Sequence, residues 1–197
     1  MTRTAAVLLA TSVTAGGLLL ATPAANASPR AGSVAATVSA TGCQRTLSNY
    51  PTVWPGDRGP AVSTLQCVLN DAGFGPVVVD GWYGPQTRAA VLRIASGTEG
   101  PVDTSGRVGR ALWTGIISAA LTDRTLRNGS TGADVLTLQR ALRAQGCTIA
   151  VDGRFGPQTV GVVKNFQRAT DNVPDGVVGE VTRFALRMWG ANDWNCP

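Results

Sequence analysis

Two stretches of this chain carry the same sequence pattern, and this internal repeat constrains the fold more than any other feature. VSTLQCVL at 62–69 aligns with VLTLQRAL at 135–142, and DGWYGPQT at 80–87 aligns with DGRFGPQT at 152–159. One alignment relates the two copies from Val53 to Trp189. The chain is therefore a duplication of one small unit, which predicts two tandem domains of the same fold.

Each copy has the pattern of three short helices. In the second copy Val135, Leu138, Gln139 and Leu142 follow the spacing of one helical face, and Gly146 ends that helix. A short extended segment and an Asp-Gly turn follow. A second helix starts at Gly-Pro-Gln-Thr, because proline suits the first helical position, and a third helix completes the copy at 179–189 or 109–118. We therefore predict an all-α fold of two tandem small three-helix domains with short extended segments and turns.

The N-terminus has the composition of an export signal. Arg3 precedes an apolar run at 5–20, and Ala25-Asn26-Ala27 offers a signal-peptidase site. We expect a secretory signal peptide at 1–27, a flexible N-terminal extension at 28–50 anchored at Cys43, the first repeat at 51–118 and the second at 126–197. The link between the repeats is 119–125. No later segment is apolar for long enough to span a bilayer, so we expect a soluble, secreted protein.

Four cysteines follow the predicted signal peptide: Cys43, Cys67, Cys147 and Cys196. An even number in an exported protein predicts two disulfides, for which three pairings are possible. We favour Cys43–Cys67 and Cys147–Cys196, which keep each bridge inside one repeat, although the sequence leaves the pairing open. The chain has no histidine and no CxxC motif, so we expect no zinc site, no other metal and no cofactor.

The charge and the missing histidine exclude several classes of function. Lys+Arg number 17 against 12 Asp+Glu, and the arginines are scattered, which predicts a solvated basic surface that suits an anionic partner. Nothing beyond this charge supports nucleic-acid binding. Without histidine there is no Ser-His or Cys-His pair, and the sparse acids lie in turns or at helix starts, so we expect no enzyme activity. Lysine-poor, Ala/Arg/Gly-rich composition is typical of a GC-rich genome, which suggests an actinobacterial host.

The candidate contact residues lie in and around the Asp-Gly turns. We interpret the aspartate and the aromatic residue of each turn as its frame, and the residue between them as pointing outward. A glutamine inside an apolar helical stripe is expected to hold a neighbouring loop, with a hydrogen bond to ligand as the alternative. Four tryptophans near the ends of the predicted helices could stack on sugars, but we expect them more often to cover the core (Trp54, Trp113, Trp189, Trp194). The candidate ligand-binding residues are Gln66, Asp80, Trp82 and Tyr83 in the first copy, and Gln139, Asp152, Arg154 and Phe155 in the second.

The second copy carries a string of motifs that resembles a known family. The motifs are Leu126-x-x-Gly129-Ser130-x-Gly132-x-x-Val135-x-x-Leu138-Gln139-x-x-Leu142, Asp152-Gly153-x-Phe155-Gly156-x-x-Thr159, Val163-x-x-Phe166-Gln167, and Asp175-Gly176-x-Val178-Gly179-x-x-Thr182. This string resembles the peptidoglycan-binding domain family of type 1. In the first copy Ile94, Ala95 and Ser105 replace Phe166, Gln167 and Asp175. The resemblance implies a three-helix fold that attaches proteins to the bacterial cell wall.

From this resemblance we expect a secreted, non-catalytic, monomeric protein associated with the cell wall. Its partner would be peptidoglycan or an associated anionic wall polymer, bound by two tandem domains whose joint engagement raises avidity. The two copies leave no segment long enough for a catalytic domain. The alternative is an interaction protein that targets or inhibits a secreted wall hydrolase or toxin.

Overall fold

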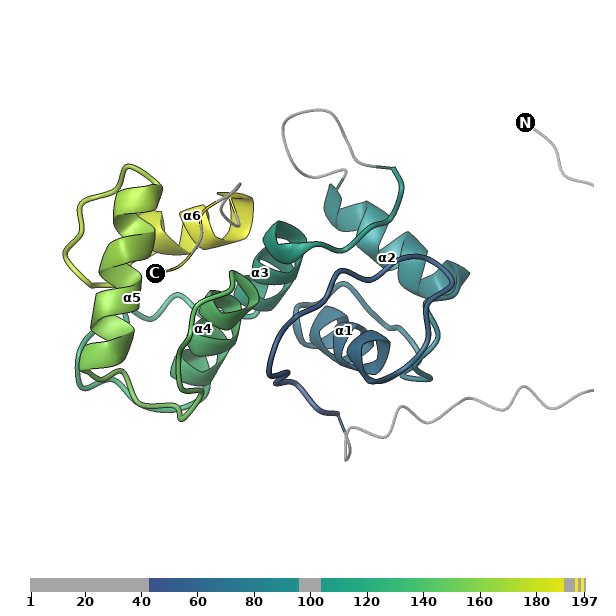
Figure 1. Cartoon of the computed structure of the whole chain (residues 1–197), viewed down its shortest axis with the longest axis horizontal. Helices are drawn as coiled ribbons and strands as arrows, with labels where there is room; N and C mark the ends of the chain where they lie inside the picture. The colour runs from purple at the N-terminus through teal and green to yellow at the C-terminus, as the bar shows by residue number, and fades with distance from the viewer. Residues whose placement is uncertain (1–42, 96–103, 190–193, 195, 197) are drawn as a thin grey trace, which may run out of the picture. The chain divides into compact units, whose positions relative to one another are not determined.

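The computed structural model describes residues 43–95, 104–189, 194 and 196, and within them the chain forms six α-helices (Figure 1). The first repeat contains α1 (Pro60–Asp71), α2 (Pro85–Ala95) and α3 (Arg110–Ala119). The second contains α4 (Ala133–Ala144), α5 (Pro157–Ala169) and α6 (Glu180–Trp189). The predicted all-α fold of two three-helix repeats is confirmed. The predicted signal peptide, 1–27, and residues 28–42 of the expected extension lie outside the described residues.

The helix ends follow from the residues that the sequence places there. Proline begins α1, α2 and α5, where its missing N–H costs no helical hydrogen bond. The first helix of each repeat ends just before a glycine with positive φ, 79° at Gly73 and 94° at Gly146. Residues with a side chain rarely adopt that conformation, so these two glycines stop the helices as the sequence predicts.

The loops of each repeat are joined by single pairs of bridging residues instead of a sheet. Val53 pairs with Val108 and Arg58 with Trp82 in the first repeat. Leu126 pairs with Val178 and Thr131 with Arg154 at the equivalent places of the second. The two copies therefore share one loop architecture as well as one order of helices.

Each repeat has an apolar core formed by its helices and its turn aromatic. In the first repeat the largest buried side chains belong to α1, α3 and the Asp-Gly turn: Leu65, Leu69, Tyr83, Trp113 and Ile116. In the second they are Leu138, Leu142, Phe155, Phe166 and Leu186. The aromatic residue of the turn is thus a core residue, which holds the turn against the helices.

The two repeats are in contact along α3, which packs against α4 and α6. Ala141 and Ala144 of α4 belong to the core cluster of the first repeat, and Thr114 Oγ1 of α3 donates to Ala141 O at 3.2 Å. The expected link, 119–125, is also packed, because Leu121 is buried in the second core and its carbonyl accepts from Arg187. The repeats share a buried boundary instead of being joined by a free tether.

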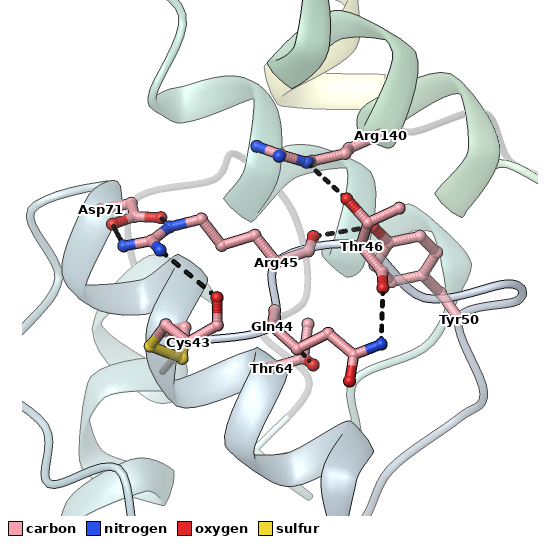
Figure 2. Close-up of polar contacts among 9 residues, drawn as sticks. Cys43, Gln44, Arg45, Thr46, Tyr50, Thr64, Asp71 and Arg140 are labelled. Atoms are coloured by element: carbon pink, nitrogen blue, oxygen red, sulfur yellow. Dashed lines mark hydrogen bonds and ion pairs between the residues drawn. A yellow bond between two sulfur atoms is a disulfide. The ribbon is translucent and has the colours of Figure 1, made fainter. Parts of the chain in front are cut away.

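Residues 43–50, at the end of the expected extension, lie against both repeats (Figure 2). Arg45 forms an ion pair with Asp71 of α1 at 2.5 Å, and Arg140 of α4 donates to Thr46 Oγ1 at 2.9 Å. Tyr50 is buried, with its ring edge-on to Trp113 at 5.2 Å between centroids. These eight residues of the expected 28–50 extension are therefore a packed part of the fold.

Two disulfides link the cysteines in the pairing that we favoured from the sequence. Cys43 bonds to Cys67 on α1, and Cys147 bonds to Cys196 near the C-terminus. The first bridge joins residues 24 apart in the sequence and the second joins residues 49 apart. Such cross-links stabilise domains whose apolar core is small. None of the helices described here has the length and apolar character that a membrane span requires.

Candidate functional site

A buried glutamine organises the Asp-Gly turn of the second repeat. The Nε2 group of Gln139 donates to Asp152 Oδ1 at 2.9 Å, to Arg154 O at 3.0 Å and to Thr159 Oγ1 at 3.3 Å. Its Oε1 atom accepts from the backbone N–H of Asp152 at 3.0 Å and of Gly153 at 2.8 Å. One amide thus fixes the turn and the start of α5. The same five bonds satisfy the hydrogen-bonding groups of the Gln139 side chain, which is 1% exposed.

The same network occurs in the first repeat. Gln66 Nε2 donates to Asp80 Oδ1 at 2.7 Å, to Trp82 O at 3.0 Å and to Thr87 Oγ1 at 3.1 Å. Its Oε1 accepts from the N–H groups of Asp80 and Gly81. The structure therefore supports the interpretation that these glutamines hold a neighbouring loop.

A third copy of the network joins α5 to α6, around Gln167. This side chain donates to Asp175 Oδ1 at 2.7 Å, to Val177 O at 2.9 Å and to Thr182 Oγ1 at 3.2 Å. The first repeat has Ala95 and Ser105 at these places, so it lacks this network. There Tyr83 Oη donates to Gly106 O at 2.5 Å instead, a contact that Phe155 of the second repeat has no hydroxyl to make.

The turn carboxylates are held in their charged form. The backbone N–H two residues along the chain donates to each of them, and this hydrogen bond is the largest cause that lowers the pKa of Asp80, Asp152 and Asp175. The glutamine amide is the second cause. These aspartates are exposed, but their carboxylates already accept hydrogen bonds from the turn. We therefore assign them to the turn and not to a ligand.

The structure divides the predicted site residues into two groups. Four side chains are 1% exposed, which leaves them no surface for a ligand: Gln66, Tyr83, Gln139 and Phe155. Asp80 and Asp152 are exposed and form the turns. Trp82 and Arg154 are exposed and lie at the equivalent position of each turn, as expected of a contact residue. Each repeat therefore has one candidate contact residue at its Asp-Gly turn, Trp82 in the first and Arg154 in the second.

The four further tryptophans differ in the same way. Trp113 is completely buried and donates from Nε1 to Pro51 O at 2.8 Å, so it belongs to the core. Trp194 is half-buried, with 5.8 Å between the centroids of its ring and the Phe166 ring. The side chain of Trp189 is not among those that the structure describes. Trp54 is 49% exposed, which leaves it as a surface residue beside the first turn.

Two arginines that the sequence analysis did not single out lie over the exposed tryptophans. The guanidinium carbon of Arg58 is 5.1 Å from the centre of the Trp82 ring, and that of Arg107 is 5.9 Å from the centre of the Trp54 ring. Both distances are in the range of cation–π attraction. Only the loop pairings bring these residues together, so a scan for short motifs could not find them. Among the described residues no group of His, Cys, Asp or Glu is arranged to hold a metal ion.

Comparison with known proteins identifies a family for most of the two repeats. The family model described as "Putative peptidoglycan binding domain" matches twice, at residues 58–114 and 131–186. A solved structure from Clostridium acetobutylicum, a fused Zn-dependent amidase/peptidase/peptidoglycan-binding domain-containing protein, is 34% identical over 34% of this chain and 30% of that chain, with a TM-score of 0.33. The SleB N-terminal domain is 35% identical over 34% of this chain and 93% of that chain, also with a TM-score of 0.33. No curated protein matches the chain.

Proposed function

Because the chain belongs to the peptidoglycan-binding domain family, we propose that it is a secreted, non-catalytic protein that attaches non-covalently to bacterial cell wall. The observation that carries the proposal is the family match in both repeats, each built around the same glutamine-centred turn. Two disulfides suit a protein that works outside the cell, and an excess of arginine suits an anionic polymer. The protein acts as a monomer that uses both repeats.

The contact residues of this proposal are Arg154 and Trp82, at the outward position of each turn. The backbone below each is fixed by a buried glutamine, so little backbone conformational entropy is lost when the side chain binds. A guanidinium group presents a rigid fork of donors that matches a carboxylate or a phosphate, both of which occur on wall polymers. Arg154 therefore contributes to the salt dependence of binding.

The contact between the repeats changes how two-site binding would work. Two modules on a flexible tether search for their second site, whereas repeats with a shared buried boundary present their sites at a fixed separation. Deleting one repeat would also expose the core of the other. Point substitutions at the turns are therefore the appropriate test of each repeat.

The test is co-sedimentation of the mature, oxidised protein with purified peptidoglycan stripped of teichoic acid, at low and high salt. We expect the protein in the pellet, and about tenfold weaker binding at low salt for Arg154→Ala, because a hydrogen bond to a charged group is lost. Arg168→Ala is the matched control, since Arg168 is exposed in the same repeat and donates to Asn165.

Three results would contradict parts of the proposal. Protein that stays in the supernatant at both salt concentrations excludes attachment to peptidoglycan itself. A fall in the turbidity of purified sacculi would show catalysis. A partner that co-purifies in stoichiometric amount from culture supernatant would favour the alternative, an interaction protein for a secreted hydrolase or toxin.

A further inference from the structure

Four exposed side chains of the first repeat lie on loops that backbone hydrogen bonds hold side by side. The loop 53–59 pairs with 81–83, since Gly56 N donates to Tyr83 O and Gly59 N donates to Gly81 O, both at 2.9 Å. The same loop pairs with Val108 through two hydrogen bonds of Val53, at 3.1 and 2.9 Å. Together these pairings gather the residues that we define as the aromatic surface: Trp54, Arg58, Trp82 and Arg107.

These side chains point outward because their neighbours in the chain point inward. Val53 and Tyr83 are 3% and 1% exposed, and successive side chains of extended backbone lie on opposite faces. Trp54 and Trp82, next to them, are therefore turned to solvent, with 49% and 39% of their surface exposed. Two large rings exposed on paired loops are a candidate binding surface.

The rings are held in place before any ligand arrives. Arg58 lies over Trp82 and Arg107 over Trp54, so each ring has a cationic neighbour. A Cβ atom at Gly84 would lie 2.8 Å from Cε3 of Trp82, so the glycine lets this ring lie close against the backbone. A surface that is already ordered loses little entropy on binding.

A pocket opens beside this surface and shares Arg58 with it. Its volume is about 520 Å³, within the range of small-ligand sites, and its polar lining includes Ser63 and Asp80. The lining is completed by Cys43, Gln44, Gly59, Pro60, Cys67, Val79 and Gly81. An aromatic surface next to a pocket with polar groups in its lining fits a ligand with an apolar ring face and polar substituents at its edge.

The second repeat has the same backbone frame with different chemistry on it. Arg127 N donates to Ser130 Oγ at 3.0 Å where Trp54 N donates to Asp57 Oδ2 at 2.8 Å. The positions equivalent to the aromatic surface carry Arg127, Thr131, Arg154 and Val177. None of these is aromatic, so the two repeats present different surfaces to the same polymer.

We propose that the aromatic surface of the first repeat is a carbohydrate site that stacks on neutral sugar rings of the glycan strand. The inference rests on the proposed function and names the part of the polymer that this repeat recognises. The C–H face of a pyranose ring covers the indole face opposite the guanidinium group, while Arg58 and Arg107 donate to hydroxyl and carbonyl oxygens at the edge of the sugar. Tryptophan and arginine are the residue types that most often dominate binding energy at interfaces.

The experiment is calorimetric titration of the full mature, oxidised protein with an uncharged hexamer of β-1,4-linked N-acetylglucosamine. The variant W54R/W82R places at these positions the residues that the second repeat carries on the same frame. We expect it to bind the hexamer at least about tenfold more weakly, because truncating the central aromatic residues of a site costs that much or more. W54F/W82F, which keeps aromatic rings, should bind within about threefold of the natural protein.

Phe184→Arg is the matched control, since Phe184 is an aromatic residue that is 58% exposed on α6, away from this surface. It should leave hexamer affinity unchanged. Equal hexamer affinity of W54R/W82R and the natural protein would overturn the inference, as would sedimentation with peptidoglycan without any binding of the hexamer. Hexamer binding without sedimentation would instead refute the proposed attachment to the wall and leave the carbohydrate site standing. Binding to neither would refute both.

Discussion

Replacing Gln139 by leucine removes the amide that holds the turn of the second repeat and changes the side-chain volume little. Five hydrogen bonds are lost: those to Asp152 Oδ1, Arg154 O and Thr159 Oγ1, and those from two backbone N–H groups. One abandoned group, the N–H of Gly153, belongs to a buried residue and cannot turn to water, whereas the hydroxyl of Thr159 keeps its own hydrogen bond to Arg154 O at 3.4 Å. An unsatisfied buried N–H costs about 1–3 kcal/mol and the other lost hydrogen bonds add about 1 kcal/mol, so we expect a total loss of about 2–4 kcal/mol.

The assay is equilibrium unfolding of the oxidised protein in urea, followed by tryptophan fluorescence and circular dichroism. A loss of about 2–4 kcal/mol is a large part of the stability of a small domain, so the midpoint should fall clearly. Gln158→Leu is the matched control, because Gln158 is an exposed glutamine on α5 whose two hydrogen bonds, from Ala150 N at 3.3 Å and to Thr148 O at 3.4 Å, are both long. This control should cost less than about 0.5 kcal/mol.

Gln66→Leu should lower the free energy of unfolding about as much as Gln139→Leu. Its hydrogen bonds go to the equivalent groups of the first repeat and have similar lengths. If Gln139→Leu costs no more than Gln158→Leu, the reasoning that the glutamine organises the turn is refuted. A loss confined to wall binding, with stability unchanged, would restore the alternative in which the glutamine hydrogen-bonds a ligand.

Three other predictions follow from the same structure. The folded protein lowers the pKa values of Asp80, Asp152 and Asp175, so the charged carboxylates stabilise it. Their contribution to the free energy of unfolding is complete above the unfolded pKa, about 3.9, and is lost as the pH falls through the lower folded pKa. The urea midpoint should therefore decrease as the pH is lowered below about 4, and it should decrease less steeply in Asp152→Asn. Equal slopes in the two proteins would contradict this. Removing Cys147–Cys196 as C147S/C196S should cost about 2–4 kcal/mol, measured by urea unfolding, and an unchanged midpoint would show that the bridge constrains nothing. Gln145 is buried, and within the described part of the chain its amide has no hydrogen-bond partner, so Gln145→Leu should raise stability by about 1 kcal/mol or more; a lower thermal midpoint would contradict it.

Much of the fold was predictable because local chemistry and the duplication point to the same result. Proline at helix starts and glycine at helix ends placed the elements, since these residues restrict or free the backbone wherever they occur. The disulfide pairing that keeps each bridge inside one repeat is also the observed one.

The candidate site was predicted less well, and two residues show why. Gln139 lies on a helical stripe in the sequence, which indicates burial but not the partners that satisfy the amide. Arg107 is far from Trp54 in the chain, and only the pairing of Val53 with Val108 brings them together. Periodicity reports which way a side chain faces, whereas the neighbours across a loop pairing depend on the closed fold.

The duplication, the order and ends of the helices, and the outward position of Trp82 and Arg154 all follow from local sequence patterns. Tertiary structure alone decided that the repeats share a buried boundary, where Ala141 of α4 enters the core of the first repeat. It also decided that residues 43–50 lie against both repeats, as the bond from Arg140 to Thr46 shows. The physical reason is range: capping and turn formation act over a few residues, but burial joins whichever apolar surfaces meet when the whole chain closes.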